Sequence, residues 1–161
     1  MRIIFLDFDG VMNNNKFLQA KPSAENASAQ QVDPRAVVLL DKLVKSTDAK
    51  IVISSSWRHS RKVSEIQDIL RQAGSRVAFR AVIDRTPVGE GNRGQEIQDW
   101  LDLDPEREVV NPAHEPLQAY VILDDTNEMS PEQQNNLVQT NPQHGLTDQD
   151  VVEAISILRM R

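Results

Sequence analysis

The 161-residue chain contains no cysteine, which excludes disulfide bonds and metal sites built from thiolates. No apolar run approaches the ~20 residues that a membrane-spanning helix needs, and no charged-then-apolar leader opens the sequence. Internal repeats are absent, so we expect one domain over residues 1–161. These absences favour a cytoplasmic protein without membrane contacts.

Positive charge is in the minority, because the formal net charge is −6 at pH 7. This balance argues against broad, nonspecific binding to nucleic acids. A local basic groove remains open as an alternative, because arginines recur at positions 58, 61, 71, 76, 80, 85 and 93. We therefore expect any nucleic acid to be recognised by a few arginines near a site and not by the whole surface.

The most informative feature is a pair of acids directly after the apolar segment Ile3–Leu6. Four β-prone apolar residues predict a buried parallel strand, and Asp7, Asp9 and Gly10 follow it. A calcium-binding EF-hand loop would need an oxygen ligand at its fifth position, where Val11 stands. A hairpin turn would need a second strand immediately afterwards, but the next residues are polar. The pair therefore favours a site for a metal ion and a phosphate group.

The same arrangement recurs late in the chain, where Val121–Leu123 ends in Asp124 and Asp125. Two acid-tipped apolar strands in one small domain are difficult to explain without a divalent cation. Because strands alternate with predicted helices, we expect a Rossmann-like, doubly wound α/β sheet of about five parallel strands with helices on both faces. Sites in such sheets form beyond the carboxyl ends of the strands, so the acids should meet at one edge.

Periodicity and capping residues predict the remaining elements. Helices are expected after Asp33, from Val63 to about Gly74, from Arg93 to about Leu101, and after Thr147. Further strands are expected at Lys50–Ile53, Val77–Ile83, Tyr120–Leu123 and Leu137–Thr140. A polar segment at about 13–31 follows the first acids and is predicted to be either a disordered loop or a flap over the site.

Two further motifs complete a recognisable order along the chain. Ser54 follows the second predicted strand, and Arg93 opens a predicted helix. With the acidic pairs before and after them, these residues resemble the four motifs of the haloacid dehalogenase (HAD) phosphatases over essentially the whole chain. More narrowly, the chain is similar to a smaller HAD group associated with RNA-repair proteins, in the segments Ile51–Arg58, Arg93–Leu101 and Gly145–Thr147.

The resemblance implies a Mg²⁺-dependent phosphatase that forms an aspartyl-phosphate. Asp7 would be the nucleophile, and Asp9 would protonate the leaving oxygen and later accept a proton from water. Ser54 would donate its hydroxyl to a phosphoryl oxygen, although another serine of the triplet at 54–56 is an alternative. Arg93 would supply positive charge to the phosphate.

The metal would be held by Asp7, the backbone carbonyl of Asp9 and Asp124. Asp125 would bind the ion through water or orient its neighbour. Substrate contacts are expected from Gly10, which allows close backbone approach, from Ser55 and from Arg58.

Two of the residues near the serines have alternative roles. Arg58 would grip a second phosphate or the substrate backbone, or form a structural ion pair. Trp57 would stack on a base, or pack beneath the site.

Substrate size is predicted from the space between the motifs. The interval after the first acidic pair and the interval between Ser54 and Arg93 are both too short for a large cap domain. A site without a cap is open, which suits large phosphorylated substrates such as an RNA or DNA end carrying a 3′- or 5′-phosphate. A small nucleotide phosphatase is the alternative enzyme. A catalytically inactive metal- or phosphate-binding module is the alternative of another class. The sequence makes no prediction of oligomeric state.

Overall fold

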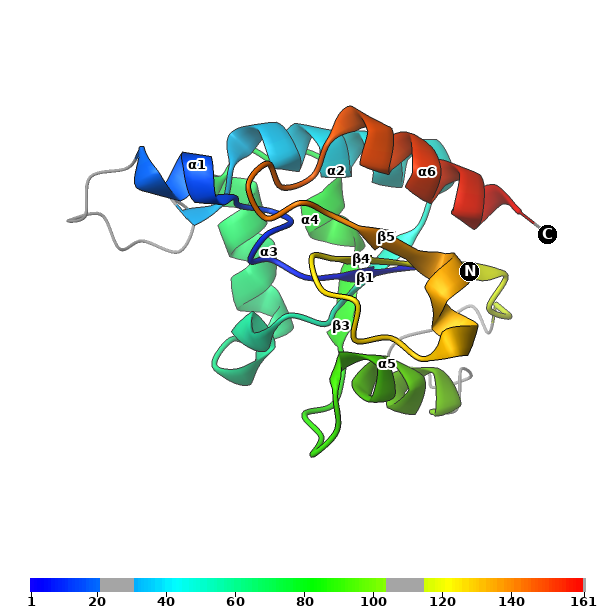
Figure 1. Ribbon diagram of the computed structural model, residues 1–161. Helices are drawn as coiled ribbons and strands as arrows, with labels where there is room; N and C mark the ends of the chain where they lie inside the picture. Colours follow the sequence, from blue (N-terminus) through cyan, green and yellow to red (C-terminus); the bar gives the residue numbers. More distant parts are fainter. Residues whose placement is uncertain (21–30, 104–114, 161) are drawn as a thin grey trace.

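The computed structural model describes residues 1–20, 31–103 and 115–160 (Figure 1). One parallel sheet has the strand order β3-β2-β1-β4-β5. Its strands are β1 (Arg2–Leu6), β2 (Lys50–Ile53), β3 (Val82–Arg85), β4 (Ala119–Asp124) and β5 (Leu137–Gln139). The central position of β1 explains its unbroken apolar sequence, because both faces of a central parallel strand are covered. The predicted α/β fold is confirmed.

Helices cover both faces of this sheet. They are α1 (Asn15–Gln19), α2 (Pro34–Thr47), α3 (Val63–Gln72), α4 (Ala78–Ala81), α5 (Arg93–Asp102) and α6 (Asp148–Arg159), with 3-10 turns η2 (Ser56–His59) and η3 (Pro131–Asn136). In Figure 1, α2 and α6 lie side by side on one face, and α5 lies on the other. Side chains of Asp33, Asn92 and Thr147 cap α2, α5 and α6 as the sequence predicts. Among the described residues, no helix has the length and apolar character needed to cross a bilayer.

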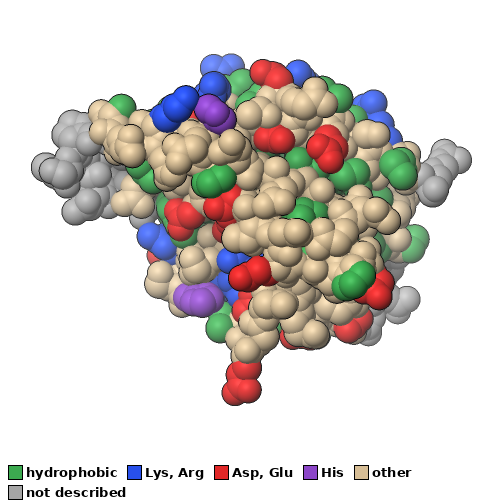
Figure 2. Space-filling view, in the orientation of Figure 1, with side chains coloured by type: hydrophobic (Ala, Val, Ile, Leu, Met, Phe, Trp, Pro, Cys, Tyr) green, Lys and Arg blue, Asp and Glu red, His purple; other side chains and the backbone are tan. Residues whose placement is uncertain are grey.

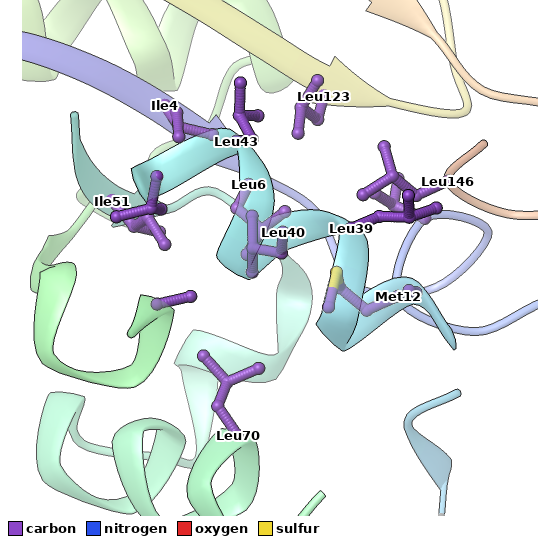
Figure 3. Packing of buried hydrophobic residues seen from close by; sticks show 14 of the residues in the cluster. Ile4, Leu6, Met12, Leu39, Leu40, Leu43, Ile51, Leu70, Leu123 and Leu146 are labelled. Atoms are coloured by element: carbon purple, nitrogen blue, oxygen red, sulfur yellow. The ribbon is translucent and has the colours of Figure 1, made fainter. Parts of the chain in front are cut away.

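Within the described residues, the buried apolar side chains form two clusters separated by the sheet. Ile4 and Leu6 of β1 belong to the larger cluster, which α2 and α6 cover, and Figure 3 shows its closely packed side chains. Ile3 and Phe5 belong to the smaller cluster beside α5. Successive strand residues point to opposite faces, so β1 contributes to both clusters and is held firmly up to the acids that follow it.

The predicted strand at Val77–Ile83 is wrong in its first half. Residues Ala78–Ala81 form α4, and β3 begins only at Val82. The reason lies in α2, where the Asp41 carboxylate accepts hydrogen bonds from the backbone amides of residues 76, 77 and 78. These amides are therefore bound to a side chain and cannot join a strand ladder.

The predicted polar segment at about 13–31 is only partly described. Asn14 is buried and caps α1, accepting a hydrogen bond from the amide of Phe17 at 2.8 Å. The segment thus contains a short helix that neither a loop nor a flap prediction included. Residues 21–30 lie outside the described residues, so the flap stays a prediction.

Candidate active site

The acids that follow β1 and β4 meet at the carboxyl edge of the sheet. The two strands are paired in parallel with Leu6 opposite Leu123, which brings Asp7 beside Asp124. Carboxylate oxygens of Asp7, Asp124 and Asp125 all lie within 4.8 Å of one another. In Figure 2, acidic and basic side chains lie together left of the centre, on the side where β1 and β4 end in Figure 1.

Arg93 provides the positive charge at this edge. Its Nη1 atom lies 3.3 Å from Asp7 Oδ1 and 3.2 Å from Asp124 Oδ2. The next residue fixes this position, because the Gly94 amide donates to the Glu128 carbonyl at 2.9 Å and a Cβ there would collide with the same loop. The first turn of α5 is thereby held against the segment after β4, and Arg93 faces the acids.

Burial makes the acidic cluster electrostatically unfavourable without a cation. Desolvation and the nearby charge of Asp124 raise the pKa of Asp7 to about 7, and Arg93 opposes part of this shift. The pKa of Asp125 is also raised, first by burial and then by Asp124. One arginine does not balance three carboxylates. This donor set, composed only of oxygen atoms, fits Mg²⁺ or another hard divalent cation.

Ser54 offers a hydroxyl to the same region. It follows β2, and its amide donates to the Leu6 carbonyl at 3.0 Å. Its Oγ atom is buried and is the side-chain polar atom left without a partner in the part of the chain that the structure describes. The Ser55 hydroxyl already has one partner, because it accepts a hydrogen bond from the Trp57 amide at 3.2 Å. Among the serines, the unpartnered hydroxyl of Ser54 therefore favours contact with a ligand. The substrate contact expected from Ser55 stays a prediction.

The chain matches the model of one protein family. Residues 3–151 match the family described as the HAD domain in Swiss Army Knife RNA repair proteins. The chain belongs to this family. Membership confirms the resemblance predicted from the four motifs and identifies a HAD-type hydrolase domain. No curated protein and no solved structure matches the chain.

Gly10 allows the motif loop of the HAD domain to pass close to the acids. Its φ is +82°, a conformation that favours glycine. Its carbonyl accepts a hydrogen bond from Thr140 Oγ1 at 2.7 Å, and its amide donates to Asn13 Oδ1 at 3.0 Å. The loop is therefore anchored both by the segment after β5 and by its own Asn13.

Arg58 forms a structural ion pair, the second of its two predicted roles. It is buried and forms an ion pair with Glu96 of α5, with 2.7 Å between Nη2 and Oε2. Its other donors bind backbone carbonyls of residues 54, 55 and 86. Arg58 thereby joins the serine turn of the HAD domain to the helix that carries Arg93, and its substrate contact stays a prediction.

Asp9 is exposed, and its carboxylate is not one of the three that cluster at this edge. Trp57 Nε1 lies 3.3 Å from both of its carboxylate oxygens, and Asn13 Nδ2 donates to Oδ1 at 3.0 Å. Trp57 itself is buried and stacks on Phe8, with 4.7 Å between ring centroids. Packing beneath the site, the second of its predicted roles, is the one that the structure provides.

Sequence reasoning missed Thr126. Its amide and its hydroxyl both donate to Asp124 Oδ1 at 2.9 Å, which leaves Oδ2 for Arg93. An acid followed two residues later by threonine at a strand end is a typical side-chain-capped turn. That spacing was a usable signal for a residue that orients one of the clustered acids.

Proposed function

We propose that this HAD domain is a Mg²⁺-dependent phosphomonoesterase that acts through an aspartyl-phosphate on Asp7. The observation that carries the proposal is the convergence of a nucleophile, a positive charge and an unpartnered hydroxyl. Asp7 is held by Arg93, and the buried hydroxyl of Ser54 has no partner within the described residues. A buried donor without an acceptor is costly, and a phosphoryl oxygen would satisfy it.

The carboxylates of Asp7, Asp124 and Asp125 are suited to hold the cation, together with the backbone carbonyl of Asp9. When bound, Mg²⁺ supplies neutralisation of the phosphoryl charge and fixes the orientation of its oxygens. Thr126 holds Asp124 in place for this role.

The chain's own residues account for both proton transfers. A carboxylate oxygen of Asp7 attacks phosphorus and the bond from phosphorus to the leaving oxygen breaks, while Asp9 gives that oxygen a proton. Water then attacks phosphorus, the bond to Asp7 breaks, and Asp9 takes a proton from the water. Arg93 offsets the charge on the phosphoryl group, and the Ser54 hydroxyl donates to one of its oxygens.

The proposed substrate is a nucleic-acid end that carries a 3′- or 5′-phosphate. The connection from β2 to α5 is described in full and contains only η2, α3, α4 and β3, which supports the prediction that no large cap domain lies between these motifs. An open site admits a polymer end, and RNA repair is the setting that the family's description names. The net charge of −6 favours the alternative, a small nucleotide.

Phosphate release with and without Mg²⁺ tests the proposal. The panel would contain para-nitrophenyl phosphate, nucleoside monophosphates and oligonucleotides phosphorylated at either end. We expect metal-dependent turnover that Asp7→Asn abolishes and Asp9→Asn strongly reduces, with oligonucleotides preferred over mononucleotides. A preference for mononucleotides would select the small-nucleotide alternative. Absence of turnover from folded, metal-loaded protein would overturn the proposed phosphatase activity and favour the catalytically inactive binding module.

A further inference from the structure

We propose that Trp57 and Asn13 are positioning residues that hold the Asp9 carboxylate in one orientation for proton transfer to the leaving oxygen. The inference rests on the proposed function and extends it to two residues that hydrogen-bond to Asp9. It is carried by three hydrogen bonds on a side chain that is otherwise exposed.

The Asp9 carboxylate would rotate freely if only water surrounded it. Instead Trp57 Nε1 lies at the same distance, 3.3 Å, from both carboxylate oxygens, and Asn13 Nδ2 donates to Oδ1 at 3.0 Å. Two donors from separate segments, one before and one after β2, therefore define the plane of the carboxylate. An acid that must act on one oxygen of a bound substrate benefits from such preorganisation.

Trp57 is itself rigidly held. Its ring stacks on Phe8, with an interplanar angle of 17°, and the guanidinium of Arg61 lies 4.6 Å from the ring centroid. Its backbone amide donates to Ser55 Oγ. Phe8 stands between Asp7 and Asp9 in the chain, so the indole packs on the very loop that carries both acids. The indole N–H is therefore aimed at Asp9 by packing.

Asn13 is fixed by a second bond. Its Oδ1 atom accepts from the Gly10 amide at 3.0 Å, and the side chain is buried. Because one end of the amide group accepts from a backbone N–H, the NH₂ end faces Asp9. Asn13 thus couples the position of the carboxylate to the loop that approaches the phosphate.

A positioning role makes a specific kinetic prediction. Protonation by Asp9 matters most when the leaving oxygen is strongly basic, as in phenyl phosphate, and least for para-nitrophenyl phosphate, whose phenolate leaves readily. We expect Trp57→Phe to lower kcat/KM about tenfold for phenyl phosphate and at most about twofold for para-nitrophenyl phosphate. Asn13→Ala should show the same larger loss of kcat/KM for phenyl phosphate, and it replaces Trp57→Phe in the test if that variant does not fold.

Trp100 is a matched control. It is as buried as Trp57, each being 7% exposed, and its indole N–H also donates to an aspartate, Asp84, at 2.8 Å. Trp100→Phe should lower the unfolding free energy but leave the ratio of the two kcat/KM values unchanged. Equal losses on both substrates for Trp57→Phe and Asn13→Ala would show a merely structural role and overturn the proposal.

The hydrogen bond can be tested without turnover. The chain has two tryptophans, so two indole N–H resonances are expected in the nitrogen–proton correlation spectrum. Asp9→Ala should shift the Trp57 resonance and leave that of Trp100 in place; no shift would overturn the inference. An inactive wild type with this shift would instead overturn the proposed function, and with it the catalytic role of the bond.

Discussion

The Asp125 carboxylate lies in the space that a side chain on Gly10 would occupy. A Cβ built on Gly10 would stand closer to three atoms of Asp125 than real Cβ atoms approach their neighbours. The backbone of the loop after β1 and one of the three clustered acids are thus in direct contact, so a side chain cannot be added at Gly10 without moving the carboxylate.

Gly10→Ala should consequently weaken Mg²⁺ binding as well as stability. The positive φ of Gly10 would cost about 1–3 kcal/mol of unfolding free energy with alanine, and displacement of Asp125 should weaken Mg²⁺ affinity at least about tenfold. Urea unfolding and a Mg²⁺ titration of phosphate release would measure the two effects. Gly74→Ala is the matched control, because Gly74 also has a positive φ but nothing lies within 4 Å of its added Cβ. Equal metal affinity in the two variants would contradict this account.

Arg58→Met should destabilise the protein strongly. Removal of the arginine leaves the buried carboxylate of Glu96 without its partner, and breaking a buried ion pair typically costs about 3–5 kcal/mol. The double variant Arg58→Met/Glu96→Leu should be more stable than the sum of the single losses predicts. Urea unfolding of the four proteins checks this cycle. A raised KM in Arg58→Met with unchanged stability would instead support the predicted substrate contact of Arg58.

The metal-free protein should lose stability as the pH rises from about 4 to about 7. The pKa of Asp7 is raised from 3.8 to about 7 in the folded state, so the folded protein binds more protons than the unfolded chain in this window. Stability then falls with increasing pH. Unfolding free energies measured across the window should show a steeper decline for wild type than for Asp7→Asn. Saturating Mg²⁺ should flatten the wild-type curve, and equal slopes in wild type and Asp7→Asn without metal would refute the assignment.

Thr126→Val should weaken Mg²⁺ binding with little effect on stability. The variant loses the hydroxyl that donates to Asp124 Oδ1 while the backbone amide remains. Loss of such a supporting bond typically costs about 10–100-fold in metal affinity or activity. Isothermal titration with Mg²⁺ measures the affinity directly. Thr126→Ser keeps the hydroxyl and should bind the metal like wild type; if both variants bind equally, the hydroxyl has no role in orienting Asp124.

Much of the fold and the acidic centre could be predicted from the sequence because their signals are local. An apolar segment followed directly by acids predicts a buried strand with carboxylates at its end, and Asp33, Asn92 and Thr147 cap helices within their own first turns. Parallel pairing then brings the ends of β1 and β4 together without further information. These features depend only on residues that are neighbours along the chain, or on the parallel pairing of strands that this fold class implies.

Contacts between distant segments were decided only by the tertiary structure. The α4 helix replaces half of a predicted strand because Asp41 lies more than thirty positions before the amides that it binds. An arginine such as Arg58 is a common phosphate ligand, but helix packing places Glu96 against it as an ion-pair partner. Trp57 meets Asp9 across 48 positions. No periodicity or spacing encodes such pairs, because they depend on how whole elements pack on the sheet and which polar groups are then left to satisfy one another.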